Sequence, residues 1–145
     1  ANAVQVAKAI GVDNPKVALL AAVEKVNPDK MPCTTDAAVL TQMNRRGQIK
    51  GCIIDGPLAL DNAVSKESAR IKKIVSDVAG DADILMTPDI EAGNVLYKCL
   101  FDLAQARGAG IVVGAAKPVV LTSRADTADT KLASIALAAL TAGIA

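Results

Sequence analysis

The sequence predicts a layered α/β domain with a largely parallel sheet, and three observations indicate this class. The chain has 145 residues, which is enough for one sizeable core. Its apolar fraction is 52% while its aromatic fraction is only 1%, so the core must be built from aliphatic side chains. Short apolar runs alternate along the chain with segments of helical periodicity. This order is typical of parallel strands that are covered by helices.

Short apolar runs mark the predicted strands. The run at 16–23 (KVALLAAV) is nearly continuous, which predicts a strand that is covered on both faces in the centre of a sheet. A second buried strand is predicted at 50–54, and the Asp-Gly-Pro sequence at 55–57 is interpreted as a turn that places a carboxylate at the strand's carboxyl end. Further strands are predicted at 84–87 and 111–113. Open α/β sheets bind ligands at the carboxyl ends of their strands, which is where the Asp55 carboxylate is expected.

Helices are predicted between these strands, where apolar side chains recur at three- and four-residue spacing. Capping residues mark where these helices are predicted to begin, and glycines mark where they are predicted to end. The first helix is predicted at 3–10, and the second from Thr34 or Thr35 to about Asn44. A third helix is predicted between a cap at Ser65 and Gly80, with an apolar stripe of Ile71, Ile74, Val75 and Val78. A fourth is predicted at 90–107, after a candidate cap at Asp89.

The stretch at 117–131 (KPVVLTSRADTADTK) combines the end of a short strand, two polar side chains and a helix start. The polar pair is Ser123 and Arg124, and the helix is predicted to begin near Asp126 or Thr127. A helix start has unpaired amides with partial positive charge, to which a hydroxyl and a guanidinium add further donors. The stretch therefore predicts an anion site, with phosphate as the favoured ligand.

Two acidic residues leave an alternative open at the same place. Asp126 and Asp129 have the spacing of a capping box with carboxylates at both positions. Either of them could pair with Arg124 at the surface, an interaction worth about 0 to 1 kcal/mol. In that case the arginine would have no ligand.

Charge and cysteine content exclude several classes of function. The net charge is +1, with no basic run that would favour nucleic acid or an anionic membrane. No apolar stretch approaches the roughly 20 residues of a membrane span, so the chain is expected to be soluble. Three widely separated cysteines, Cys33, Cys52 and Cys99, argue against a disulfide framework and fit a reducing cytoplasm.

The chain contains no histidine, which excludes Ser-His and Cys-His catalysis within it and makes a metal site of the zinc type improbable. A general base must then come from Asp, Glu, Lys, Tyr or Cys. Because the first residue is Ala and not Met, we expect the chain to begin inside a longer protein.

Three motifs occur in order along the chain: KGCIIDGPLALDNA from residue 50, VAGDADILMTPDIEAGNVLYK from residue 78, and KPVVLTSRAD from residue 117. Together they resemble the phosphate acetyl/butyryltransferase family, and its butyryltransferase branch more closely than its acetyltransferase branch. With the earlier stretches NAVQVAKAIG and AAVEKVNP, the match covers nearly the whole chain. The resemblance implies the two-domain α/β/α architecture of isocitrate and isopropylmalate dehydrogenases, with a homodimer and an active site in the cleft between domains. Residues 1–115 would be the second domain. Residues 116–145 would be a C-terminal segment that packs on the missing first domain, so this fragment is expected to be inactive alone.

The resemblance also implies a reaction, in which acyl-CoA and phosphate are reversibly converted to acyl phosphate and CoA. No metal or redox cofactor is needed, and CoA is a substrate. Ser123 and Arg124 match the family's Ser-Arg pair, so Arg124 is expected to hold phosphate oxygens and Ser123 to hydrogen-bond the reacting groups. In the acetyltransferase branch a catalytic Asp follows that Ser by seven residues, which falls here on Thr130. The base is therefore left open between Asp129, which is favoured, and Asp126.

Other residues are implicated as substrate contacts by the same resemblance. Asn94, Tyr97 and Lys98 match a GN-x-x-YK element, in which Lys98 is expected to meet CoA or phosphate charges, while Tyr97 could instead belong to the core or an interface. Asp55 matches the Asp-Gly of the second-domain motif and Asp61 its later Asp, although turn formation explains both equally well.

Two other functions are compatible with the same architecture. A decarboxylating dehydrogenase would need a cluster of acidic metal ligands, and the spacing of Asp55, Asp61 and Asp89 gives it little support. The second is a non-catalytic fragment, a binding or assembly module that keeps only the fold and the dimer surface.

Overall fold

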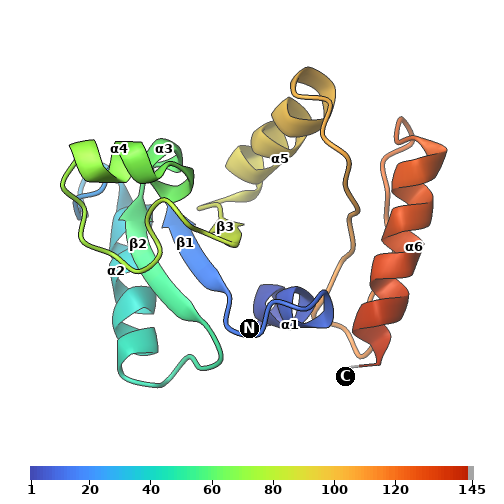
Figure 1. Cartoon of the computed structure of the whole chain (residues 1–145), viewed down its shortest axis with the longest axis horizontal. Coiled ribbons are helices and arrows are strands. Elements are labelled where there is room, and N and C mark those ends of the chain that lie inside the picture. Colours follow the sequence, from blue (N-terminus) through green and yellow to red (C-terminus); the bar gives the residue numbers. More distant parts are fainter. Residues whose placement is uncertain (144–145) are drawn as a thin grey trace. The chain divides into compact units, whose positions relative to one another are not determined.

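A computed structural model describes residues 1–143, and the chain forms two compact units (Figure 1). Unit 1 consists of Ala1–Val12 and the chain from Asn94 onward, and unit 2 is Asp13–Gly93. The predicted α/β class is confirmed. The predicted boundary at residue 115 concerns a longer protein and stays a prediction. Within residues 1–143, no helix has both the length and the apolar character that crossing a membrane requires.

Unit 2 is built on three parallel strands: β1 (Lys16–Leu20), β2 (Ile53–Leu58) and β3 (Ile84–Met86). Their order in the sheet is β2-β1-β3, so β1 is central, as its apolar run predicts. The last four residues of β1 are all buried. The strand ends at Leu20, earlier than predicted, because the chain turns away after Ala21 donates its amide to the Leu58 carbonyl at 2.9 Å.

The predicted turn at 55–57 is wrong, because β2 runs straight through it. Asp55 lies within the strand and pairs with Ala18 of β1. Since β2 is an edge strand, Pro57 costs it no necessary ladder hydrogen bond. Gly56 allows a close approach to β1, because a Cβ there would lie 2.6 Å from the Cβ of Leu19. The Asp-Gly-Pro sequence therefore marks a close strand pairing.

Helix α2 (Pro32–Arg45) packs along β2. Thr41 donates its hydroxyl to the Gly56 carbonyl at 3.3 Å, and Asn44 both donates to the Cys52 carbonyl at 3.0 Å and accepts from the Ile54 amide at 3.0 Å. The predicted threonine cap is wrong. The helix begins at Pro32, whose ring presets the backbone, and the chain needs no side-chain cap there.

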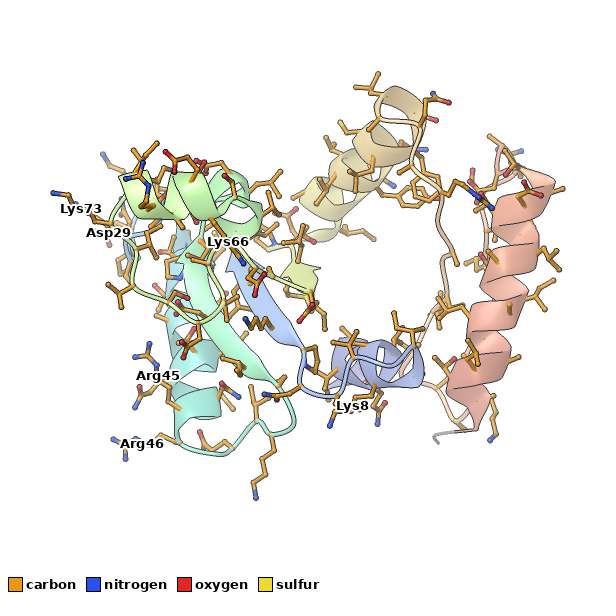
Figure 2. All side chains as sticks on the ribbon, in the orientation of Figure 1. Lys8, Asp29, Arg45, Arg46, Lys66 and Lys73 are labelled. Atoms are coloured by element: carbon orange, nitrogen blue, oxygen red, sulfur yellow. The ribbon has the colours of Figure 1, made fainter. Side chains whose placement is uncertain are left out.

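Two short helices, α3 (Leu60–Val64) and α4 (Lys66–Ile71), replace the long helix predicted up to Gly80. The Ser65 cap is confirmed, because its hydroxyl accepts from the Ser68 amide at 3.2 Å. The helix ends early because Lys73 takes a positive φ of 56°, and Figure 2 shows its side chain extending outward. Val75 is 100% exposed while Val78 is fully buried, so the predicted stripe does not exist beyond Ile71.

Lys72 is exposed and joins two segments of unit 2 through its ammonium group. Its ammonium lies 2.6 Å from a Glu24 oxygen, in the loop after β1, and 2.9 Å from an Asp61 oxygen in α3. Hydrogen bonding to Lys72 lowers the pKa of both carboxyl groups. Asp61 therefore has a structural role in this unit.

Unit 1 contains α1 (Asn2–Ala9), the π-helix η1 (Cys99–Leu103) and α6 (Ala128–Ala142). Helix α5 (Ile90–Lys98) begins in the range of unit 2 and ends in unit 1. Its predicted cap is confirmed, since Asp89 accepts from the Ala92 amide at 2.7 Å. The helix predicted to reach residue 107 changes to π geometry at Cys99 and stops at Ala104.

The short strands predicted in unit 1, at 111–113 and around Val119 and Val120, reduce to one antiparallel bridge. The amides and carbonyls of Val112 and Val119 exchange hydrogen bonds of 2.8 and 2.9 Å. A longer ladder fails because Pro118 has no amide and Gly114 turns the chain with a φ of 108°. The fourth strand of the predicted sheet is therefore wrong for the described residues.

Helix α6 begins where predicted, but with a different cap. The Thr127 hydroxyl accepts from the Thr130 amide at 3.2 Å, so a Thr-Thr pair replaces the expected Asp126 and Asp129. The apolar stripe of this helix is exposed, with Leu132 at 67% and Ile135 at 57%. The described residues therefore leave the most apolar face of α6 uncovered.

Candidate functional site

Unit 1 contains a hollow of about 840 Å³ beside the start of α6, called here the α6 hollow. Three segments line it: the end of α5 with η1, the loop that follows η1, and the loop that leads into α6 together with the first two turns of this helix. The lining residues are Tyr97, Lys98, Phe101, Asp102, Gln105, Ala106, Arg107, Gly108, Ala109, Ser123, Ala125, Asp126, Thr127, Asp129, Thr130 and Ala133.

Five of the eight side chains predicted for the site line this one hollow. They come from two stretches of sequence, the GN-x-x-YK element and the segment before α6, and are Tyr97, Lys98, Ser123, Asp126 and Asp129. The two stretches are more than twenty residues apart in the chain. Their meeting is decided by the tertiary structure of unit 1.

Asp126 ties the two stretches together. One carboxylate oxygen, Oδ2, accepts from the Ser123 amide at 2.7 Å, and the other, Oδ1, accepts from the Tyr97 hydroxyl at 3.3 Å. Burial, and then the negative charge of Asp126, raise the pKa of Tyr97, so the phenol keeps its proton and remains a donor. With both oxygens engaged, Asp126 anchors the Ser123 loop to α5.

Ser123 is exposed, and several of the amides around it already have acceptors, including its own, which donates to Asp126. Its hydroxyl oxygen accepts from the Ala125 amide at 3.4 Å, and its carbonyl accepts from the Asp126 amide at 3.1 Å. Within residues 1–143, the amides of Ala128 and Asp129 at the start of α6 have no acceptor. The donors available to an anion here therefore include the Ser123 hydroxyl and these two amides.

Arg124 is exposed and adjacent to the hollow without lining it. The surface pairing considered above does not occur, since the described part of the chain holds no ion pair between this guanidinium and Asp126 or Asp129. Its side chain is thus uncommitted.

Asp129 occupies the first turn of α6 and lines the hollow. It is exposed, and none of the described side chains or amides hydrogen-bonds to its carboxylate. Of the two candidate bases, Asp129 is the one with both oxygens available to a ligand.

Among the lining residues that sequence reasoning missed are Arg107 and Phe101. Both fall inside the stretch predicted as one continuous helix. The available signal for Arg107 is its position directly before Gly-Ala-Gly, which ends a helix. With Lys98 it supplies positive charge to a hollow that also contains the carboxylates of Asp102, Asp126 and Asp129.

The remaining two predicted residues lie elsewhere. Asn94 is exposed on α5, one turn before Lys98, and does not line the hollow. Asp55 belongs to unit 2, where its carboxylate lies 3.9 Å from the guanidinium of Arg45. Figure 2 shows Arg45 projecting outward from α2. Asp55 and Arg45 help to line a separate hollow of about 300 Å³.

The fold and this site define an α/β protein in which a hydroxyl, free carboxylates and cations surround one hollow. Residues 1–139 match the family model described as Phosphate acetyl/butaryl transferase, and the chain belongs to this family.

Similar proteins carry names of both branches of the family. The chain is 59% identical to the phosphate butyryltransferase of Clostridium acetobutylicum over 98% of its length, and 59% identical to the phosphate acetyltransferase of Thermotoga maritima over 96%. It covers 47% of each of these proteins. Equal identity to both leaves the acyl group undecided.

Solved structures agree on the fold. A branched-chain phosphotransacylase from Enterococcus faecalis is 41% identical, with a TM-score of 0.84 over 97% of this chain and 50% of that one. The chain therefore spans about half the length of the relatives that it matches.

Proposed function

We propose that the full-length protein is a phosphate acyltransferase, which reversibly transfers a short acyl group between CoA and phosphate. The observation that carries the proposal is the α6 hollow, where five side chains expected from the family resemblance meet. Membership of the family supports the same reaction.

In this proposal phosphate attacks the thioester carbonyl in one direction, and the CoA thiol attacks the acyl phosphate in the other. Asp129 removes the thiol proton as the general base, a role typically worth about 10²- to 10⁴-fold in rate. The Ser123 hydroxyl donates to the oxygen that gains negative charge. Asp126 and Tyr97 hold the Ser123 loop in place through their hydrogen bonds.

The cationic side chains at the hollow bind the phosphate groups of both substrates, which are inorganic phosphate and CoA. Lys98 and Arg107 line the hollow and Arg124 stands beside it, so each can meet an anionic oxygen. CoA is a substrate, and no metal or redox group has a role in this mechanism. We place the enzyme in the cytoplasm, which the absence of a disulfide framework in the sequence supports.

We further propose that the uncovered face of α6 packs on the half of the full-length protein that lies outside this chain. The chain covers 47% of its relatives, so a segment of similar size is available to cover this face. Leu132, Ile135 and Leu140 are each more than half exposed, so covering them recovers a corresponding part of the about 1.5 to 3 kcal/mol that full burial of such a side chain contributes. A homodimer, as the resemblance implies, is part of the same proposal.

The test is release of CoA thiol from butyryl-CoA by the full-length protein. We expect thiol release that depends on added phosphate and yields acyl phosphate. Release without phosphate would indicate a thioesterase. Oxidative decarboxylation of a hydroxy acid with a nicotinamide cofactor would support the dehydrogenase alternative, and the absence of any turnover would support a binding module.

Replacement of Arg107 by alanine is expected to raise the KM for phosphate or for acyl-CoA by about 10- to 150-fold, because a charge-assisted hydrogen bond contributes about 1.5 to 3 kcal/mol. Arg124→Ala is expected to raise the KM for phosphate within the same range. Steady-state kinetics with each substrate varied in turn measures both effects.

Arg46→Ala is the matched control, because Arg46 is an exposed arginine at the end of α2, in unit 2 (Figure 2). Unchanged kinetics for Arg107→Ala would remove that residue from the site, and the same holds separately for Arg124.

A further inference from the structure

The chain's only tyrosine and only phenylalanine form a pair in the wall of the α6 hollow. The ring centroids of Tyr97 and Phe101 are 4.3 Å apart, with the planes tilted by 33°. Neither residue is buried, and the buried apolar core of the chain consists of aliphatic side chains and Cys52. Aromatic side chains are not needed here to fill the core, so their position at the hollow calls for a different explanation.

Both rings have a defined neighbour. The Tyr97 hydroxyl donates to Asp126, and the Phe101 ring lies against Gly108, where a Cβ would come 2.5 Å from the Phe101 Cζ. Phe101 sits in the π-helical turn that follows α5, and such turns often occur at functional sites. The pair therefore forms a fixed apolar wall, with the small side chains of Ala106 and Ala133 lining the same hollow.

This wall begins close to the reacting end of the site. One carboxylate oxygen of Asp126 accepts a hydrogen bond from the Ser123 amide at 2.7 Å, and the other accepts from the Tyr97 hydroxyl at 3.3 Å. Only one carboxylate thus separates Ser123 from the aromatic pair. A butyryl chain extends three carbon–carbon bonds of about 1.5 Å each from its carbonyl carbon, which suits a group held at Ser123 and lying along the wall.

The chemistry of this wall argues against the other parts of the substrate at this place. Neither ring of the Tyr97–Phe101 pair carries a charge, and the Tyr97 hydroxyl already donates to Asp126. The nucleotide end of CoA is a polyanion, and the pantetheine arm has amides that require hydrogen-bond partners. The acyl chain is the one uncharged and apolar part, and Phe101 and Ala133 offer it apolar contact.

We propose that the Tyr97–Phe101 wall, together with Ala133 of the same α6 hollow, binds the acyl chain and selects a short aliphatic group longer than acetyl. This inference rests on the proposed function. A methylene in such a pocket is worth about 10-fold in kcat/KM at the low end of the usual range, so butyryl should be preferred to acetyl by about 100-fold.

The test compares kcat/KM for butyryl-CoA and acetyl-CoA in the full-length protein. Phe101→Ala and the milder Phe101→Leu should lower the butyryl to acetyl ratio, the former by about 10-fold or more. Ala133→Leu, which fills the space instead, should lower the ratio by a similar factor. The KM for phosphate should stay unchanged in all three. Ala104→Leu is the control, because Ala104 is exposed at the end of η1 and does not line the hollow.

A butyryl to acetyl ratio that is the same in the wild type, Phe101→Leu and Ala133→Leu would overturn the inference while acyl phosphate formation, and with it the proposed function, stands. A wild-type protein that forms acyl phosphate from neither thioester would refute the proposed function as well. A fall in activity with both thioesters by the same factor would show that the wall has a structural role only.

Discussion

Replacement of Asp129 by asparagine is expected to lower kcat by about 10²- to 10⁴-fold, the usual contribution of a general base. The physical reason is that Asp129 lines the α6 hollow with both carboxylate oxygens available in the described structure. Asparagine keeps the size and the position in the first turn of α6 but cannot take a proton from the CoA thiol. The KM values should change little, because the substitution removes an interaction that matters in the transition state.

Asp126→Asn is the matched comparison, and its effect should be smaller and of a different kind. The amide group of asparagine would present a donor to either the Ser123 amide or the Tyr97 hydroxyl, both of which now donate to Asp126. The Ser123 loop would loosen, so KM and thermal stability should change together with kcat. A larger loss of kcat in Asp126→Asn than in Asp129→Asn would exchange the two roles.

Replacement of Gly80 by alanine is expected to destabilise unit 2 by about 3 kcal/mol, the largest effect on stability that we predict. Two costs add at this position. Gly80 has a φ of 77°, where a side chain costs about 1 to 2 kcal/mol, and a Cβ there would lie 2.6 Å from the Lys66 Cα. Backbone of α4 must move to relieve that contact, which typically costs about 1 to 3 kcal/mol.

Two other glycines of unit 2 separate these costs. Gly47 has a φ of 71° with nothing within 4 Å, so Gly47→Ala should show the conformational cost alone. Gly56 has no positive φ but a Cβ there would lie 2.6 Å from the Leu19 Cβ, so Gly56→Ala should show the steric cost alone. Urea unfolding monitored by circular dichroism measures all three. A Gly80→Ala variant no less stable than Gly47→Ala would show that the backbone of α4 yields without cost.

The central features of the fold could be predicted from local pattern. The continuous apolar run of β1 indicates a strand with neighbours on both sides, and the parallel order β2-β1-β3 confirms it. Ser65 and Asp89 cap their helices because a short side chain directly before a helix places its oxygen within reach of the unpaired amides of the first turn. These are decisions that a few adjacent residues make.

Two of the failed predictions show what the spacing of apolar and turn residues leaves out. The stripe after Ile71 has helical spacing, but Ser76 accepts from the Val78 and Ala79 amides and Val78 is buried in unit 2. The Asp-Gly-Pro sequence resembles a turn, but its glycine meets Leu19 of the neighbouring strand. At Gly56 a contact far along the chain overrides the local preference, and after Ile71 the side chain of Ser76 and the burial of Val78 do so.

By itself, the sequence determined the α/β class, the central strand, the start of α6 and the residue types of the site, because each depends on spacing and on the chemistry of neighbouring residues. Only the tertiary structure decided which of those residues share a hollow. It placed Tyr97 and Lys98 with Ser123 and Asp129, engaged Asp126 on both oxygens, and added Arg107 and Phe101. The meeting of Tyr97 and Lys98 with the segment before α6 follows from contacts between stretches more than twenty residues apart, and no local pattern encodes such contacts.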